Sequence, residues 1–255
     1  MALFSNRSSA PPAATQMRIA DKSATYVVTL KRTATTRRFT LRVRNATRDV
    51  VLTIPQRASI IEARDFAEKH AAWIGERLQK LPHPLPFVDG CIIPLRGIPH
   101  IIQHRPGARG TVWVEGVTTA GGPALALCVA GKAEHLGRRV QDYLRTQALA
   151  DLNVAAGAYA GKLGLTPKRI SIRDSKTRWG SCSADGSLNF SWRIVLAPAF
   201  VLDYLAAHEV AHMVHLNHSP KFWTLTRRLC AETDRAEAWL DAHGTQLHRY
   251  GQKAE

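Results

Sequence analysis

The chain has 255 residues, of which 45% are hydrophobic and 22% are charged. These are ordinary values for a globular protein, and they argue against a wholly disordered, collagen-like or coiled-coil chain. No apolar run reaches the roughly 18 residues that a membrane-spanning helix needs, and the first residues hold no apolar stretch of secretory-signal length. We therefore expect no membrane association. The length suits one large domain or two small ones.

The net charge is +15, and the basic excess is concentrated toward the N-terminus. One stretch has no acidic residue and seven basic ones, Lys31, Arg32, Arg37, Arg38, Arg42, Arg44 and Arg48. Such a stripe could attract nucleic acid, nucleotides, acidic peptides or anionic lipid, and it could equally be a solvated strand face. Proteins that bind single-stranded nucleic acid usually combine basic residues with aromatic side chains on which the bases stack. Phe39 is the one aromatic residue among these charges, so this pattern is weak here.

The four cysteines are widely spaced and form no Cys-x-x-Cys pair. A chain of this length needs no disulfide to hold its core, so we interpret them as reduced thiols and expect a cytoplasmic protein.

The N-terminal half is predicted to be rich in strands. Residues 1–22 are expected to be a flexible tail, and strands are expected at 26–30, 39–44 and 50–54 from their β-branched and alternating residues. Ser59 and Glu62 have the spacing of a capping box, which opens a helix predicted to run to about residue 80. The proline-rich segment 81–86 marks a linker or domain edge. Four short strands are expected at 91–93, 98–104, 111–114 and 124–129.

The C-terminal half is predicted to be mainly helical. A long helical pattern covers 133–163 and stops at Gly164, and two strands follow at 169–173 and 187–192 on either side of a loop. Further helices are expected to begin at Pro198 and at Ser219-Pro220, and the last is expected over 234–247. These elements together predict an α+β fold with a small sheet in the C-terminal part.

The strongest motif is His-Glu-Val-Ala-His at 208–212, within a helical pattern. Histidines four residues apart project from one helix face, so His208 and His212 can ligate a single Zn²⁺. Glu209 lies about 100° around the helix from His208, where it can reach a zinc-bound water and act as the base when that water attacks a peptide carbonyl. About 0.02 such motifs are expected by chance from this composition.

A catalytic zinc ion usually has three protein ligands and one open position. His218 can supply the third if the helix ends near residue 216, and the following Ser219-Pro220 favours a break there. His215 is a rival, although it lies about 10.5 Å along the helix from His208. Glu232 and Glu237, on a later helix, are the others.

Several further segments resemble the YgjP-like metallopeptidase family. They are Arg-Trp-Gly-Ser-Cys at 178–182, Leu-Asn-Phe-Ser-Trp-Arg at 188–193, Asp-Tyr at 203–204, Asn-His-Ser at 217–219 and Phe-Trp at 222–223, together with the 208–212 motif. The likeness covers most of residues 35–247. It implies a zincin-like helical metallopeptidase core with Zn²⁺ held by His208, His212 and His218. The family is more distantly similar to SprT-like proteases, and some of its members have been assigned nucleotide pyrophosphatase activity.

With this resemblance, we expect a tail at 1–22, a basic β-rich N-terminal part with one helix at 23–130, and a zincin-like metal-binding catalytic domain at 131–250. The predicted function is zinc-dependent hydrolysis of peptide or protein substrates. Arg178 is a candidate for orienting a carboxylate or phosphate of the substrate, and an ion pair with Asp174 or Asp185 is its alternative role. Trp179, Phe222 and Trp223 are expected to be packing residues.

Two other functions stay open at this point. One is hydrolysis of a nucleoside triphosphate (UTP-type) to release pyrophosphate, although the chain has no Gly-rich phosphate loop and its imidazoles favour Zn²⁺ over Mg²⁺. The other is a DNA-associated protease, recruited through weak nucleic-acid binding by the basic N-terminal strands.

Overall fold

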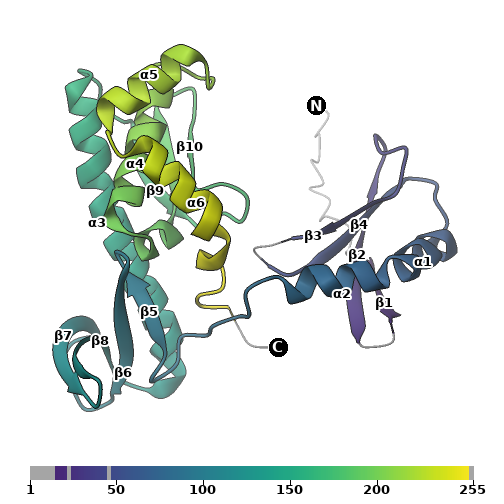
Figure 1. The fold of residues 1–255 in the computed structure, drawn as a ribbon, viewed down its shortest axis with the longest axis horizontal. Coiled ribbons are helices and arrows are strands. Elements are labelled where there is room, and N and C mark those ends of the chain that lie inside the picture. Colours follow the sequence, from purple (N-terminus) through teal and green to yellow (C-terminus); the bar gives the residue numbers. More distant parts are fainter. Residues whose placement is uncertain (1–14, 22–23, 45–46, 253–255) are drawn as a thin grey trace, which may run out of the picture. The chain divides into compact units, whose positions relative to one another are not determined.

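The computed structural model describes residues 15–21, 24–44 and 47–252. These residues form six α-helices and three small mixed sheets, which confirms the α+β class (Figure 1). The chain divides into two compact units, Met1–Leu81 and Pro82–Glu255. None of the described helices has the length and apolar character needed to cross a membrane.

The first unit is a four-stranded sheet with two helices. Its elements are β1 (Thr15–Ala20), β2 (Thr25–Thr33), β3 (Thr40–Val43), β4 (Val50–Pro55), α1 (Ile60–Lys69) and α2 (Ala71–Gln79), and the strand order is β1-β2-β4-β3. Alternate apolar residues such as Leu30 and Leu52 form its core with the inner faces of the helices. The capping box predicted at Ser59 is confirmed.

Two expectations for this unit need correction. The helix expected to run to residue 80 is broken at His70, whose ring nitrogen contacts the Phe66 carbonyl while its backbone N–H donates to Ala67. Part of the expected tail, residues 1–14 and 22, lies outside the described residues. Residues 15–20 form β1, because Met17 and Ile19 are buried when this segment pairs with β2.

The second unit contains the other two sheets and four helices. Its elements are β5 (Ile92–Leu95), β6 (Ile98–Arg105), β7 (Val112–Thr119), β8 (Gly122–Ala130), η1 (Ala133–His135), α3 (Leu136–Lys162), β9 (Arg169–Arg173), β10 (Gly180–Cys182), β11 (Ser187–Ser191), η2 (Trp192–Leu196), α4 (Ala199–His212), α5 (Pro220–Leu229) and α6 (Thr233–Leu247). The strand orders are β5-β6-β8-β7 and β10-β11-β9.

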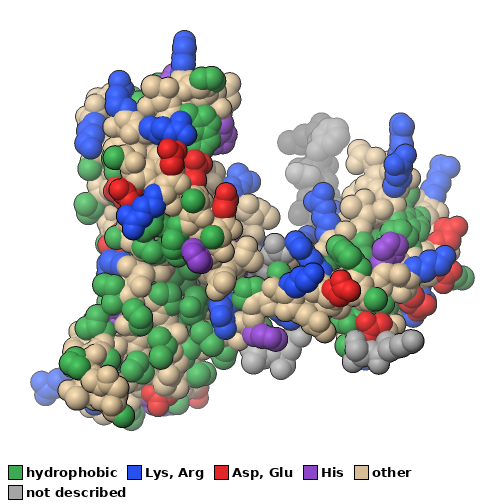
Figure 2. Space-filling model, viewed as in Figure 1, with side chains coloured by type: hydrophobic (Ala, Val, Ile, Leu, Met, Phe, Trp, Pro, Cys, Tyr) green, Lys and Arg blue, Asp and Glu red, His purple; other side chains and the backbone are tan. Residues whose placement is uncertain are grey.

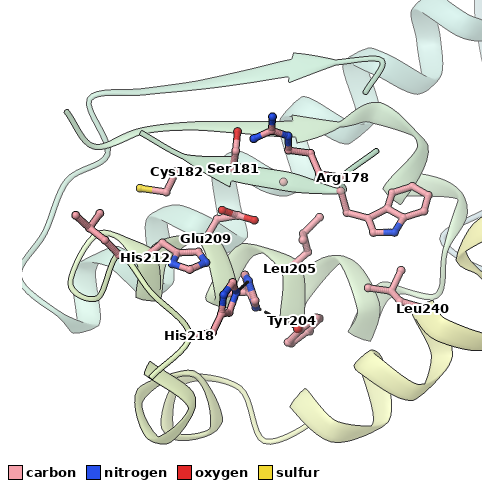
Figure 3. A pocket seen from close by; sticks show the side chains of 13 residues that line it. Arg178, Ser181, Cys182, Tyr204, Leu205, Glu209, His212, His218 and Leu240 are labelled. Atoms are coloured by element: carbon pink, nitrogen blue, oxygen red, sulfur yellow. Dashed lines mark hydrogen bonds between the residues drawn. The ribbon is translucent and has the colours of Figure 1, made fainter. Parts of the chain in front are cut away.

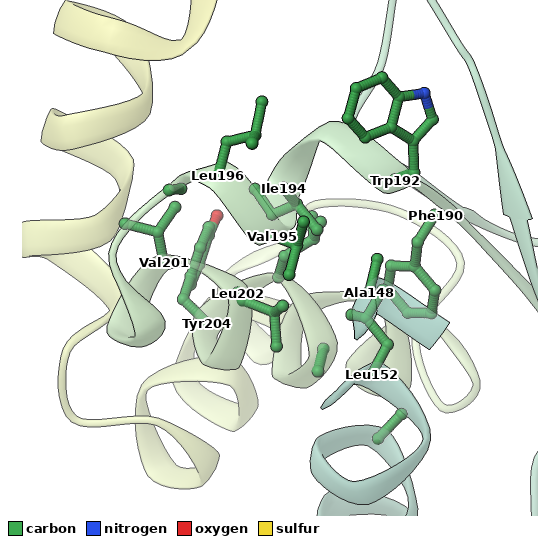
Figure 4. Close-up of a cluster of buried hydrophobic side chains, with 14 of the residues drawn as sticks. Ala148, Leu152, Phe190, Trp192, Ile194, Val195, Leu196, Val201, Leu202 and Tyr204 are labelled. Carbon is green, nitrogen blue, oxygen red and sulfur yellow. The ribbon is translucent and has the colours of Figure 1, made fainter. Parts of the chain in front are cut away.

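One hydrophobic core joins both sheets of this unit to α3 and α4. Leu127 of β8, Leu152 of α3, Phe190 of β11 and Val201 of α4 all belong to it, and Figure 4 shows the part around η2. The contacts therefore divide the chain at Leu81, within the predicted proline-rich linker, and not at the boundary expected near residue 130. The physical reason is that strands β5 to β8 cannot bury their apolar faces without α3.

A tight turn between β5 and β6 contacts the segment that leads into α4. Arg96 and Gly97 both have positive φ, 52° and 78°, which is the pattern of a two-residue type I′ turn. Their N–H groups donate to the carbonyls of Val195 and Leu196 at 2.7 and 3.3 Å. Arg96 is also held by a bidentate ion pair with Asp151 of α3. The turn thus fixes the start of the helix that contains the 208–212 motif.

We predict that Gly97→Ala destabilises the second unit by about 2 kcal/mol. The alanine would have to keep the positive φ of 78°, which is strained for a residue with a side chain, and its Cβ would lie 2.9 Å from Pro198 Cα. Urea unfolding followed by circular dichroism measures this change. Gly107→Ala is the matched control, since no atom lies within 4 Å of its Cβ position. Equal stability of the two variants would contradict the prediction.

Candidate metal centre

The 208–212 motif lies at the C-terminal end of α4. His208 and His212 are one turn apart on this helix. The helix is buried on most sides, and Glu209 is only 4% exposed. It ends at His212, earlier than the expected end near residue 216, and the chain turns back over the next five residues. Ser219 caps α5 by accepting from the N–H of Phe222, which holds His218 at the beginning of that helix.

The chain reversal brings His218 to the two histidines of α4. One ring nitrogen from each of His208, His212 and His218 can be chosen so that all three lie within 4.8 Å of one another. The Nε2 atoms of His208 and His218 are 3.2 Å apart. Two nitrogens bound tetrahedrally to one zinc ion at about 2.05 Å lie about 3.3 Å apart, so this spacing fits a shared ion. Figure 3 shows the His212 and His218 rings on one side of the strand that carries Ser181 and Cys182, with Glu209 between these rings and the strand.

The outer nitrogens of two rings have hydrogen-bond partners that select the tautomer. His212 Nδ1 lies 3.0 Å from the His215 carbonyl, which can only accept. His208 Nδ1 lies 3.1 Å from the hydroxyl of Tyr204, and that hydroxyl donates to Glu237 Oε1 at 3.2 Å. Both Nδ1 atoms therefore carry the proton, and both Nε2 lone pairs are left for a metal ion.

Aromatic side chains of α5 pack against the histidines. The Phe222 ring is stacked on His212 with 4.4 Å between centroids, and Trp223 lies beside His218 at 5.6 Å. Phe222 is completely buried. These contacts restrict the rotation of the imidazoles, which agrees with the packing role predicted for both aromatic residues.

The environment keeps His208 and His212 neutral and raises the pKa of Glu209. Burial, followed by the charges of His212 and His218, lowers the pKa of His208 to about 3, and burial also lowers the pKa of His212. Neutral imidazole is the form that binds metals. Burial raises the pKa of Glu209 to about 8, against the opposing charge of Arg178. A divalent cation among the imidazoles would stabilise the carboxylate and lower this pKa.

Strand β10 forms the other wall of the site. A Cβ at Gly180 would lie 2.7 Å from Cδ of Glu209, so only glycine lets the strand approach the carboxyl group this closely. The pocket between β10 and α4 has a volume of about 440 Å³ and is lined by residues that include Gly180, Tyr204 and all three histidines. β10 is one of the two edge strands of its sheet, so the pocket adjoins a strand edge.

The three residues considered as alternatives to His218 for the third metal ligand have other partners in the structure. His215 contributes its backbone carbonyl, Glu237 accepts from Tyr204, and Glu232 pairs with Arg235 at 2.7 Å. Within the described ranges, the residues that qualify as a metal-binding group of at least three are the histidines at 208, 212 and 218.

Arg178 lines the pocket, but Figure 3 shows its guanidinium and the Ser181 hydroxyl on the side of β10 away from Glu209 and the imidazoles. Neither ion pair considered for Arg178 is present among the described residues. Asp174 pairs with Arg193, and Asp185 pairs with Lys168.

The sequence alone does not assign the roles that the structure gives to Tyr204, Glu237 and Gly180. Tyr204 could have been found, because it precedes His208 by four residues and so lies on the same helix face. Glu237 was considered only as a metal ligand. Gly180 belongs to a segment that carries the family resemblance, but its role depends on how closely β10 approaches α4 in the folded chain.

The basic stripe lies on β2, β3 and the segments around them. Six of its seven side chains are exposed, and Figure 2 shows Lys and Arg side chains projecting from this unit. Arg32 donates to the carbonyls of Gln56 and Ala58, both at 2.8 Å, and Arg48 donates to the carbonyl of Leu81 at 3.0 Å, so two of the seven have structural roles. A solvated strand face accounts for the rest equally well, and nucleic-acid binding stays a prediction.

Three converging imidazoles beside a buried carboxyl group are typical of a metal-dependent hydrolase. The family model described as "YgjP-like, metallopeptidase domain" matches residues 37–243, so the chain belongs to the YgjP-like metallopeptidase family. A search of curated proteins gives no match. Among solved structures, the chain is similar to the metallopeptidase zymogen abylysin of Pyrococcus abyssi, with 21% identity over 39% of this chain and 97% of that one, and a TM-score of 0.34.

We predict that Gly180→Ala lowers peptidase activity at least tenfold, because the added methyl group displaces the Glu209 carboxyl group. Steady-state assays with a casein substrate measure the loss, and thermal unfolding checks that the variant stays folded. Gly116→Ala is the control, since it is also in a strand and its Cβ position has no atom within 4 Å. Unchanged activity in a folded Gly180→Ala protein would contradict this account of the strand.

Proposed function

We propose that this protein is a zinc-dependent peptidase in which His208, His212 and His218 hold the ion and Glu209 is the general base. The observation that supports the proposal most directly is the convergence of three imidazole nitrogens within 4.8 Å. A donor set made only of imidazoles favours Zn²⁺ over Mg²⁺, which prefers carboxylate oxygens and water. The buried Glu209 Oε2 has no hydrogen-bond partner among the described residues, which suits a carboxylate that faces a bound water or ion.

When bound, the zinc ion would supply a Lewis acid that polarises the peptide carbonyl and lowers the pKa of a water molecule. Glu209 would take the proton of the attacking water at its carboxylate and deliver it to the departing amine nitrogen. Its placement between β10 and the imidazoles limits its movement, so its orientation is fixed before substrate binds. Tyr204 and the His215 carbonyl would keep the ligand rings in the required tautomer.

The substrate would bind as an extended strand along β10. This strand is at the sheet edge and borders the pocket, so its free backbone groups can pair with a peptide. Family membership supports a peptide substrate. Pyrophosphate hydrolysis and recruitment to DNA stay predictions, because no observation on the described residues favours either one over peptide hydrolysis.

We predict that Glu209→Gln binds zinc with unchanged stoichiometry and loses activity by about 10²–10⁴-fold, the usual contribution of a general base. The measurements are metal content by mass spectrometry and turnover of a casein substrate. Glu232→Gln makes the same chemical change outside the cluster and should leave both values unchanged. Full activity in the Glu209→Gln protein would reject the assigned role.

We also predict that His218→Ala weakens zinc binding at least tenfold, whereas His215→Ala changes it less than threefold, since His215 uses only its backbone carbonyl. Competition with a chromogenic chelator gives both affinities. If the two substitutions weakened binding equally, His218 would not be the third ligand.

A further inference from the structure

The sheet β10-β11-β9 has one apolar face and one polar face. In β9 and β11, the residues Ile170, Ile172, Leu188 and Phe190 belong to or pack against the core of the second unit. Because side chains alternate along a strand, the residues between them lie on the opposite face. The strand register places Ser181 and Ser171 on either side of Asn189, and it pairs Ser191 with Arg173.

These side chains form a second cavity beside the metal centre. It has a volume of about 270 Å³, and its polar lining, which we call the polar pocket, consists of Arg173, Ser175, Arg178, Ser181, Asn189 and Ser191. The cavity shares four lining residues, 178–181, with the pocket that contains the histidines. A group bound here would therefore lie directly across β10 from Glu209.

The polar pocket has a positive charge, and the part contributed by Arg178 also acts on Glu209 across β10. Its lining includes no acidic residue. Within the described part of the chain, Arg178 has no hydrogen bond or ion pair, and Arg173 makes a single long hydrogen bond of 3.4 Å to Asn189 Oδ1. The adjacent Asp174 is bound to Arg193 at 2.8 Å and to Lys176 at 3.6 Å. Two guanidinium groups are thus available to an anion.

The remaining polar atoms of the pocket are mostly donors. Ser191 is only 1% exposed, and its buried hydroxyl has no hydrogen-bond partner among the described residues. A buried hydroxyl without a partner is unfavourable, so a ligand that accepts its proton would be stabilised. The Oδ1 atom of Asn189 already accepts from Ser171 at 2.6 Å, which leaves the amide NH₂ group as a donor. Donors and positive charge together select a ligand with anionic oxygens.

We propose that the polar pocket is an oxyanion subsite that binds a carboxylate or phosphate group of the substrate while the scissile bond lies at the metal centre. The guanidinium groups of Arg173 and Arg178 would bind the anionic oxygens, and the Ser191 hydroxyl would donate a further hydrogen bond. The part of this proposal that concerns substrate cleavage rests on the proposed peptidase function. The binding of an anion does not.

Binding is tested with the full-length protein and two probes, inorganic phosphate and N-acetylglutamate, by isothermal titration calorimetry. We expect at least one probe to bind, and the R173Q/R178Q double variant to lose at least tenfold in affinity.

R169Q is the matched control, since Arg169 is an exposed residue on the same face of β9 outside the pocket, and it should change affinity less than twofold. Because all three proteins keep the histidines, anion binding at the metal does not contribute to the difference. No binding of either probe, or equal affinity in the double variant and the control, would overturn the proposal.

Cleavage is tested with peptide pairs that differ only by Glu or Gln at one position, scanned along the substrate. At one position, kcat/KM should be at least tenfold higher for Glu than for Gln, and in the double variant the Glu-to-Gln ratio of kcat/KM should fall below twofold. A preference that persists in the double variant would overturn the proposed subsite. If no peptide is cleaved by any of the proteins, the peptidase function fails, and the titrations alone decide whether the subsite exists.

Discussion

The site depends on the end of α4 at His212 and the immediate reversal of the chain. A longer helix would carry the following residues away from the motif, about 1.5 Å for each residue added. The reversal instead brings His218 to 3.2 Å from His208, and the Ser219 cap of α5 holds it there. Three imidazoles this close are favourable only if they stay neutral or share a cation, and burial lowers the pKa of His208 and of His212. The local backbone thus creates a position suited to one metal ion.

The surroundings of the cluster restrict it from three directions. The Tyr204 hydroxyl and the His215 carbonyl fix the outer nitrogens of two rings, and Phe222 packs against the face of His212. On the third side, Gly180 lets β10 approach Glu209. Each contact comes from a different segment, so the geometry of the site depends on the shared core of the second unit. This arrangement is expected where ligand orientation must be established before the metal or substrate binds.

Local signals in the sequence predict most of the helices and strands and the 208–212 motif, but they do not predict the helix break at His70 or the pairing of distant segments. The capping box at Ser59, the Ser219-Pro220 helix start and the histidine spacing each depend on neighbouring residues, and each agrees with the structure. β10 was expected to be part of a loop, because a three-residue strand has no usable alternation and its pairing with β11 is not local. The expected domain boundary near residue 130 differs from the observed division after Leu81. Here too the cause is packing between distant segments, because only the folded core shows that β5 to β8 pack with α3.

We propose that these three histidines share one zinc ion. The anomalous diffraction of crystals of the full-length, zinc-loaded protein, measured above and below the zinc absorption edge, tests this sharing. We expect a single strong anomalous peak about 2.0–2.1 Å from one nitrogen of each of the histidines at 208, 212 and 218, with a fourth coordination position that no protein atom occupies. A peak elsewhere, or a peak that only two of these rings contact, would contradict it.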